Sequence, residues 1–328
     1  MRELRNHLLA ETIDDLMQEA YELVLNDGLE IRPSKGPAKE LFGVLLELEN
    51  PRARVSRSQR REKIFSALGE LLWYLSGSDD STQISHYVRY YEDPGLSIDG
   101  HVTGAYGPRL MSFDGVNQID RVIQTLRQKP DSRNALIQLF DHEDTDNAPC
   151  TLAIQFVVRE GHLTVMTSMR SNDLYLGLPH DIFAFTMIQE IVARSLSVKV
   201  GRYFHSVGSL HLYEKHYRAA REYQDEGWHL NVDMPSMPAG DPWPAIRHLI
   251  RTEEEIRTAS HVEIDSIDLP PEPYWRDLSL LLYAHKLILE KRLGDLVPIK
   301  EALDSPYFRT IIQDRIDMRT NGMSHNVN

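Results

Sequence analysis

The chain contains a single cysteine, Cys150, among its 328 residues. One thiol excludes a framework of intramolecular disulfide bonds and is typical of proteins in a reducing compartment. The chain also lacks a long apolar run near its start, because charged residues interrupt the apolar ones within residues 1–15. Neither a signal peptide nor a membrane anchor is indicated, so we expect a cytoplasmic protein.

Basic residues are too few for a general nucleic-acid-binding surface. The chain has 36 Lys and Arg against 49 Asp and Glu, a formal net charge of -13, whereas binding to nucleic acid needs cations that displace counterions from phosphates. A small anionic ligand remains compatible with this composition, because a few arginines in a pocket can bind it locally. The length and the hydrophobic content of 41% allow one large domain or two small ones.

Hydrophobic periodicity predicts both helices and strands. Apolar residues recur at helical spacing in three segments: 7–25, 64–75 and 182–196. Strand-like runs occupy four segments, with Glu160-Gly161 as a hairpin turn between the last two: 41–48, 135–140, 152–158 and 163–167. Residues 91–112 are rich in Gly and Asp and predict a loop. Strands mixed with long helices, without regular alternation, indicate an α+β domain.

The character of the chain changes near residue 231. Residues 234–242 and 270–273 are rich in helix breakers. Amphipathic helices are predicted between and after them, at 243–258, 274–293 and 307–318. We therefore predict a mixed domain of residues 1–230 and a mainly helical region of residues 231–328 that packs on it.

Several short motifs follow one another in a recognisable order. They are Ala148-Pro149-Cys150-Thr151, Arg170-Ser171-Asn172-Asp173, Gly177-Leu178-Pro179-His180-Asp181 and His211-Leu212-Tyr213. Their order and spacing resemble the thymidylate synthase family over roughly residues 7–220. The resemblance implies a thymidylate synthase-like mixed sheet packed with long helices, here with a helical C-terminal extension. It also implies transfer of a one-carbon unit from 5,10-methylenetetrahydrofolate, a co-substrate, to a pyrimidine nucleotide.

Cys150 occupies the position of the family's nucleophile. By this resemblance its thiolate adds to C6 of the pyrimidine, which makes C5 nucleophilic toward the methylene group of the folate. A thiolate suits this reaction because it is strongly nucleophilic and can leave again, provided that nearby cations favour the ionised form. Taken alone, a cysteine beside a strand is more often a small buried hydrophobic residue. The surrounding motifs favour the nucleophile.

Arginines at matching positions indicate a bound phosphate. Arg170 and Ser171 resemble the pair that binds the nucleotide phosphate, and Arg133 resembles an arginine that the family supplies from the partner subunit of a homodimer. Guanidinium groups suit phosphate because they donate two parallel charge-assisted hydrogen bonds. The family's usual phosphate loop, Arg-Thr-Gly-Thr, is absent here. Arg32 or Lys35 in the replacing loop is the candidate phosphate contact.

Glu70 lies on an otherwise apolar helix, which suits its carboxyl group to general acid and base catalysis. It resembles the family's glutamate that organises water and relays protons, and Tyr106 resembles a second member of that network. Asp173 and Gly177 match a folate-contacting loop. Each has an ordinary structural alternative, a surface charge for Glu70 and a plain turn for the folate loop.

His211 and Tyr213 resemble the residues that hold the sugar hydroxyl. An alternative role for His211 is a metal site shared with His205 and His216. Neither a supporting carboxylate cluster nor a recognised zinc spacing accompanies these histidines, so we expect no metal.

Asp181 bears on the choice of base. Members of the family that act on uracil carry asparagine there, because an amide can donate to O4 and accept from N3–H at once. An ionised aspartate only accepts, which suits the exocyclic amine of cytosine, and a buried mismatch costs about 1 to 3 kcal/mol. The family's cytidylate hydroxymethylases show this same substitution. The structural alternative is that Asp181 caps a helix beginning at Ile182.

Three further departures bear on the end of the reaction. Methylating members shield the intermediate with tryptophans after the glutamate helix and with a closing C-terminal segment. Residues 91–104 contain no tryptophan here, residues 322–328 do not resemble that segment, and Thr151 replaces a histidine that commonly follows the nucleophile. The resemblance therefore predicts that water adds to the intermediate, which gives a 5-hydroxymethyl group and tetrahydrofolate.

The favoured hypothesis is a folate-dependent 5-hydroxymethylase of a cytidine monophosphate, acting as a homodimer with shared active sites. CMP is preferred slightly to dCMP because the phosphate loop is so altered. The alternatives are a thymidylate synthase that methylates dUMP and a catalytically inactive nucleotide-binding protein. Binding alone needs none of Cys150, Glu70 and Tyr106, so their presence argues against the inactive protein.

Overall fold

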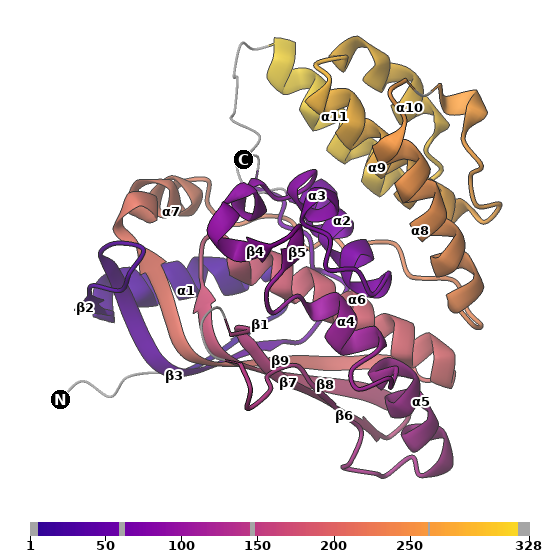
Figure 1. Cartoon of the computed structure of the whole chain (residues 1–328). Helices are drawn as coiled ribbons and strands as arrows, with labels where there is room; N and C mark the ends of the chain where they lie inside the picture. Colours follow the sequence, from indigo (N-terminus) through magenta and orange to yellow (C-terminus); the bar gives the residue numbers. More distant parts are fainter. Residues whose placement is uncertain (1–5, 59–62, 145–147, 262, 321–328) are drawn as a thin grey trace.

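The computed structural model describes residues 6–58, 63–144, 148–261 and 263–320. A mixed sheet forms one layer, helices cover one of its faces, and the helices nearest the C-terminus form a further layer beyond them (Figure 1). None of the helices in these ranges is both long and apolar enough to cross a membrane. Residues 322–328, which were used to predict that water adds to the intermediate, lie outside the described residues.

Within the described residues, the main sheet contains β1 (His7–Ala10), β2 (Leu29–Ile31), β3 (Ala38–Leu48), β6 (Leu136–Gln138), β7 (Thr151–Arg159), β8 (His162–Asp173) and β9 (Lys199–Tyr213). The strand order is β1-β3-β9-β8-β7-β6, with β2 paired to β3. The β1–β3 and β8–β9 pairs are parallel, and the other pairs are antiparallel. A small separate sheet joins β4 (Ser97–Ile98) to β5 (His101–Val102). The predicted α+β class and mixed sheet are confirmed.

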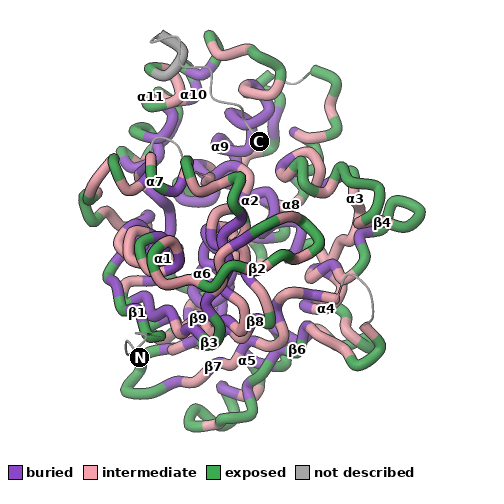
Figure 2. The backbone as a smooth tube through the Cα atoms, turned by 90° about the vertical axis from the view of Figure 1, so that its left-hand side faces the viewer, coloured by how far each residue is buried: buried purple, intermediate pink, exposed green. Residues whose placement is uncertain are grey.

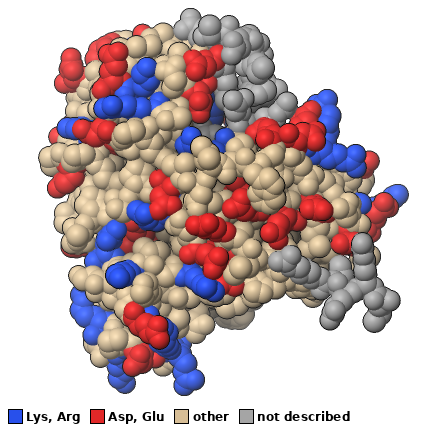
Figure 3. Space-filling view, turned by 180° about the vertical axis from the view of Figure 1, so that it is seen from behind, with Lys and Arg blue, Asp and Glu red and all other residues tan. Residues whose placement is uncertain are grey.

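The α-helices of the described residues are α1 (Ile13–Asp27), α2 (Ile64–Leu75), α3 (Ser81–Ser85), α4 (Tyr106–Met111), α5 (Gln118–Gln128), α6 (Gly177–Leu196), α7 (Tyr217–Asp225), α8 (Trp243–Thr258), α9 (Pro273–Leu289), α10 (Leu296–Ala302) and α11 (Pro306–Thr320). Buried stretches run through the middle of the molecule, and exposed stretches form its outline (Figure 2). The face seen in Figure 3 carries acidic and basic side chains interspersed, without one broad basic area.

The predicted helix over 7–25 is wrong at its start. Residues 7–10 form β1, which runs parallel to β3, and the helix begins only at Ile13. Thr12 ends the strand conformation, because its side chain accepts a hydrogen bond from the Asp15 amide and so caps the helix. Apolar residues at helical spacing continue across this boundary, which is why periodicity alone placed the helix too early.

The predicted strands correspond to β3, β6, β7 and β8, and the predicted hairpin turn is confirmed. Glu160 and Gly161 both have positive φ, 50° and 72°, as expected for a tight two-residue turn. The central strand β9 was not predicted. It packs closely against β8, since a Cβ atom at Gly208 would lie 2.8 Å from the carbonyl oxygen of Arg170. Its glycines weaken the strand pattern in the sequence while allowing this close approach.

Two predictions about local structure near the site are wrong. The helix expected from Ile182 begins at Gly177, so Asp181 lies within α6 and is not its cap. The loop expected over 91–112 contains short 3₁₀ turns, the β4–β5 hairpin and α4. Glycines and aspartates in that stretch serve the turns between these short elements, which explains the loop-like composition.

The three predicted C-terminal helices are present as α8, α9 and α11, and α10 was not predicted. Helices α8 and α9 pack against α2. The breaker-rich stretch before α8 is packed on the core, because Met234 and Met237 are buried and the Met237 amide donates to buried Glu190 of α6 at 2.9 Å. The division into domains of residues 1–230 and 231–328 stays a prediction.

Candidate active site

Cys150 directly precedes β7 and is held to the neighbouring strand. The Arg170 amide of β8 donates to the carbonyl oxygen of Cys150 at 2.9 Å. The pairing of β7 with β8 is irregular between Thr151 and Ala153, and such irregularities re-aim the side chains beside them. The half-buried thiol of Cys150 therefore sits at a point where the strand departs from regular geometry.

Burial raises the pKa of the Cys150 thiol, and the negative charge of Asp181 acts in the same direction. Arg170 and Lys35 lower this pKa but do not outweigh the burial. The cations expected near the nucleophile are thus present. In the free protein, however, the thiol is less acidic than an ordinary cysteine.

The guanidinium group of Arg170 is fixed on the segment that precedes the nucleophile. Its Nε donates to the carbonyl oxygen of Pro149 at 3.1 Å, and a terminal nitrogen donates to that of Ala148 at 2.6 Å. Ser171 follows on β8, where it pairs with Ser209 of β9. Arg170 and Cys150 are therefore brought together by the strand pairing.

Lys35 is exposed, but it contacts Tyr90 and its charge interacts with Cys150. The Lys35 ammonium donates to the hydroxyl of Tyr90 and lies 4.5 Å from the centre of that ring. Burial acts to lower the pKa of Lys35, but Tyr90, Tyr213 and Cys150 together raise it above its ordinary value. Arg32 is exposed. Lys35 therefore supplies a persistent positive charge near Cys150.

Glu70 of α2 is buried and has a partner on each carboxylate oxygen. The Tyr74 hydroxyl donates to Oε1 at 3.0 Å, and Nδ1 of His180 on α6 lies 3.0 Å from Oε2. The other ring nitrogen of His180 lies 3.0 Å from Oγ of Ser66. His180 was not predicted as a site residue. The only sequence feature that pointed to His180 was its position next to Asp181 in the motif Gly177-Leu178-Pro179-His180-Asp181.

Tyr106 links the nucleophile segment to the surroundings of Glu70. Its hydroxyl accepts a hydrogen bond from the Thr151 amide at 3.0 Å, and its ring centre lies 5.2 Å from that of Tyr74. Burial raises the pKa of Tyr106 well above its ordinary value, followed by the charges of Asp181 and Cys150. Thr151 is fully buried, and its hydroxyl has no hydrogen-bond partner within the described ranges.

Asp181 lies on the first turns of α6 and accepts a hydrogen bond at Oδ2 from Nδ2 of Asn172 at 2.8 Å. Burial raises the pKa of Asp181 well above its ordinary value, the charge of Glu70 adds to this, and the bond from Asn172 opposes it. Gly177 leaves room for the pair, because a Cβ atom there would lie 3.0 Å from Nδ2 of Asn172 and 3.5 Å from Oδ2 of Asp181.

Asp173, His211 and Tyr213 meet where β8 and β9 end. Asp173 is paired in register with His211, and the His211 and Tyr213 rings meet edge to face with centres 5.0 Å apart. Oδ1 of Asp173 accepts from the amides of Tyr175 and Leu176 at 2.8 and 3.0 Å. Asp173 therefore shapes the turn that leads into α6.

Arg133 is not brought to Cys150 within one chain. It is exposed, and its carbonyl oxygen accepts from the side chain of Gln155 at 3.0 Å. Gln155 lies five residues further along the chain than Cys150, or roughly 17 Å of extended strand. Within one chain, Arg133 therefore does not join the residues around Cys150.

The histidines considered for a metal site are engaged elsewhere. His205 bonds to Tyr203 and Asn172, while the ring of His216 stacks on Tyr175 with centres 4.4 Å apart. Across the described residues, no group of three or more His, Cys, Asp or Glu side chains is placed to hold a metal ion.

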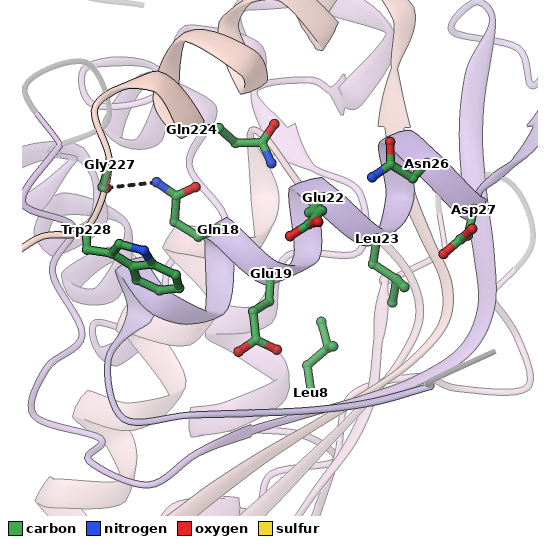
Figure 4. A pocket seen from close by; sticks show the side chains of 10 residues that line it. All are labelled: Leu8, Gln18, Glu19, Glu22, Leu23, Asn26, Asp27, Gln224, Gly227 and Trp228. Carbon is green, nitrogen blue, oxygen red and sulfur yellow. Dashed lines mark hydrogen bonds between the residues drawn. The ribbon is translucent and has the colours of Figure 1, made fainter. Parts of the chain in front are cut away.

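A pocket lies along α1, beside the end of α7 (Figure 4). It carries Glu19, Glu22 and Trp228 along its lining, and Gln18 donates there to the carbonyl oxygen of Gly227. None of the predicted site residues lines it. This pocket is therefore separate from the cluster around Cys150.

A comparison with protein-family models identifies the family of the chain. The model described as thymidylate synthase matches residues 40–228, more than half of the chain, and this range contains Glu70, Cys150 and Asp181. The mixed seven-stranded sheet with its covering helices agrees with that fold. Members of the family use methylenetetrahydrofolate to transfer a one-carbon unit to a pyrimidine nucleotide. The chain belongs to the thymidylate synthase family.

Proposed function

We propose that the protein is a folate-dependent cytidylate 5-hydroxymethylase that favours CMP slightly over dCMP. The observation that carries the proposal is Asp181, which stands beside Glu70 and accepts a hydrogen bond from Asn172 in a group that includes Cys150. A carboxylate held as an acceptor complements the N4 amine of cytosine and repels O4 of uracil. The slight preference for CMP over dCMP in this proposal rests on the altered phosphate loop.

Cys150 begins the proposed reaction by adding its thiolate to C6 of the base. The new bond between Sγ and C6 shifts electrons to C5, which then bonds to the methylene carbon carried by the folate. Lys35 and Arg170 stabilise the thiolate, because both lower the pKa of this thiol. Since burial raises the pKa, we propose that nucleotide binding precedes the loss of the thiol proton.

Glu70, His180 and Tyr74 hold the protons needed to finish the reaction. Once C5 has lost its proton, the bond between the methylene carbon and the folate nitrogen breaks, and tetrahydrofolate leaves with that electron pair. Water then bonds to the exocyclic methylene carbon and gives a proton to this network, and the bond between Sγ and C6 breaks to release the Cys150 thiolate. The net reaction consumes CMP, methylenetetrahydrofolate and water, and it yields 5-hydroxymethyl-CMP and tetrahydrofolate.

The surroundings of Asp173 and Gly177 fit the co-substrate. One oxygen of Asp173 is used in the turn before α6, and the other makes no hydrogen bond with a described residue. Gly177 lies directly beside Asn172 and Asp181. In the proposed complex Asp173 orients the folate ring, and the bound ring excludes water from Cys150 until the one-carbon unit has been transferred.

The face of the sheet opposite the helices supports a homodimer. Leu136 of β6 and Met166 of β8 both pair with Gln155, so they lie on one face, and they are 41% and 38% exposed. Phe42 of β3 is also exposed, at 76%. Apolar side chains on an uncovered sheet favour contact with a second copy, which would then supply Arg133 to the partner's phosphate site.

The decisive assay incubates the protein with methylenetetrahydrofolate and CMP, dCMP, UMP or dUMP, and identifies both products. The expected products are 5-hydroxymethyl-CMP and tetrahydrofolate, and Cys150→Ala is expected to abolish them. Conversion of dUMP to dTMP with release of dihydrofolate would show an ordinary thymidylate synthase. Tight nucleotide binding without hydrogen exchange at C5 would show the inactive binding protein.

A more specific prediction concerns Asp181→Asn. Because an amide both donates and accepts, this variant is expected to move the ratio of kcat/KM for CMP over UMP toward uracil by about tenfold or more. The matched control is Asp173→Asn, which should lower turnover of both bases alike. An unchanged ratio in Asp181→Asn would remove Asp181 from base recognition.

A further inference from the structure

A continuous row of buried polar side chains stands behind Asp181. Oγ1 of Thr167 lies 3.1 Å from the Tyr203 hydroxyl, that hydroxyl lies 2.8 Å from Nδ1 of His205, and Nε2 of His205 lies 2.9 Å from Oδ1 of Asn172. Nδ2 of Asn172 then donates to Asp181. Thr167 and His205 are paired in register between β8 and β9. All four residues of the row are at most 3% exposed.

This row can be hydrogen-bonded in only two consistent directions. Burial lowers the pKa of His205 to about 3, so its ring is neutral and carries one N–H. If Nε2 holds the proton, His205 donates to the amide oxygen of Asn172 and accepts from Tyr203. If Nδ1 holds it, every bond reverses and Asn172 must turn its oxygen toward Asp181.

The two directions make different demands on Asp181. In the first, the amide nitrogen of Asn172 donates to Oδ2, so Asp181 is an acceptor there. In the second, Asp181 must be protonated and donate to Asn172. A protonated carboxyl group has one donor and one acceptor and can therefore match uracil as well as cytosine. The observed orientation is the first, because Nδ2 of Asn172 faces Oδ2.

We propose that Asn172 and His205 are specificity-determining positioning residues, which hold Asp181 as a hydrogen-bond acceptor and thereby select cytosine over uracil. The inference rests on the proposed function. Its physical basis is that burial and the neighbouring Glu70 both favour a neutral Asp181, so the acceptor state needs a donor fixed in direction. Asn172 supplies that donor, and the row from His205 to Thr167 sets which way its amide points.

The test compares His205→Leu with His205→Gln. Leucine removes the donor to Asn172, and the ratio of kcat/KM for CMP over UMP is expected to fall about tenfold or more. Glutamine keeps an amide donor and is expected to restore most of the ratio. Tyr203→Phe is the second variant, for the case that His205→Leu does not fold. It keeps the ring but removes the hydroxyl that fixes the His205 tautomer, so the ratio of kcat/KM for CMP over UMP is expected to fall as well.

Thr186→Val is the matched control. Its hydroxyl is fully buried and donates only to carbonyl oxygens of its own helix α6, so the base ratio should stay at the wild-type value. A wild-type ratio retained by His205→Leu or, failing that, by Tyr203→Phe would overturn the inference. A wild-type enzyme that itself shows no preference for cytosine would overturn the proposed function, and the inference with it, before any variant is made.

Discussion

At the scale of single residues, Cys150 shows how burial and charge compete at a nucleophile. Two cations act on it, yet Arg170 is bonded to the carbonyl oxygens of Ala148 and Pro149, and the negative charge of Asp181 opposes ionisation. The thiol therefore ionises less readily than that of an ordinary cysteine. Its position is stable because Arg170 binds the backbone that carries it.

Alkylation of Cys150 measures this balance directly, because the chain has a single cysteine. We expect slow reaction with iodoacetamide at pH 7 and an increase that continues above pH 9, the ordinary value above which its pKa is raised. Arg170→Leu is expected to slow the reaction at pH 7 by about tenfold, one pKa unit. Arg133→Leu is the control and should leave the rate unchanged. A rate that levels off below pH 8 would contradict the raised pKa.

Asp181 links the same burial to stability. Because the pKa of Asp181 in the native protein without nucleotide is raised above the ordinary 3.8, that protein keeps a proton that the unfolded chain releases above about pH 4. The ionised acceptor form of Asp181 in our proposal belongs to the complex with cytosine. The free energy of unfolding is therefore expected to fall as pH rises from about 4 toward the native pKa, by about 1.4 kcal/mol per unit of difference. In Asp181→Asn the side chain does not ionise, so the free energy of unfolding does not fall with pH for this reason.

Urea unfolding of the wild type and Asp181→Asn, at pH values from 4 to 8, checks this expectation. The stability of the variant relative to the wild type should increase with pH. A constant difference across the range would show that Asp181 has similar pKa values in the native and unfolded states.

At the scale of elements, two helices meet at the proton network. Helix α2 supplies Ser66, Glu70 and Tyr74, and the first turns of α6 supply His180 and Asp181. Residues 66, 70 and 74 recur every four positions and therefore lie on one face of α2. This face receives His180, which bonds to Glu70 on one ring nitrogen and contacts Ser66 on the other.

His180→Phe tests whether this contact serves catalysis. The ring keeps a similar volume but leaves an oxygen of Glu70 without its partner, so we expect kcat to fall about 100-fold with little change in KM for the nucleotide. Ser66→Ala should have a smaller effect, because it removes only the more distant contact. A raised KM with unchanged kcat would assign His180 to binding instead.

At the scale of the whole molecule, the C-terminal helices are joined to α2 beside Glu70. A Cβ atom on Gly69 would lie 2.1 Å from the ring of Tyr87, so only glycine allows this ring to lie on the helix. The Tyr87 hydroxyl donates to Glu253 of α8 at 2.8 Å, and the ring stacks with His285 of α9, with centres 5.2 Å apart. The extension thereby braces the helix that carries Glu70.

Tyr87→Phe is expected to destabilise the protein by about 1 to 3 kcal/mol, because buried Glu253 loses a hydrogen bond. Thermal unfolding followed by circular dichroism measures the change. Thr258→Val, which removes an exposed hydroxyl of the same helix α8, is the control and should have little effect. An effect of Tyr87→Phe no larger than that of the control would show that the brace does not depend on this bond.

Local sequence determined the parts of the molecule that depend on neighbouring residues. Hydrophobic periodicity predicts α8 and β7 because each buries one recurring set of side chains. Positive φ at Glu160 and Gly161 follows from a two-residue turn between two strands. The order of the motifs around Cys150 indicates the family, since the chemistry requires those residue types at those places.

Only the tertiary structure decided how these parts act on one another. His205 and Asn172 are separated by 33 positions, and Ser66 and His180 by 114, so no local pattern predicts either contact. The centre of the sheet, β9, is likewise set by pairing with β3 and β8. Burial then raises the pKa values of Cys150 and Asp181, because exclusion of water depends on the whole fold and not on neighbours in the chain.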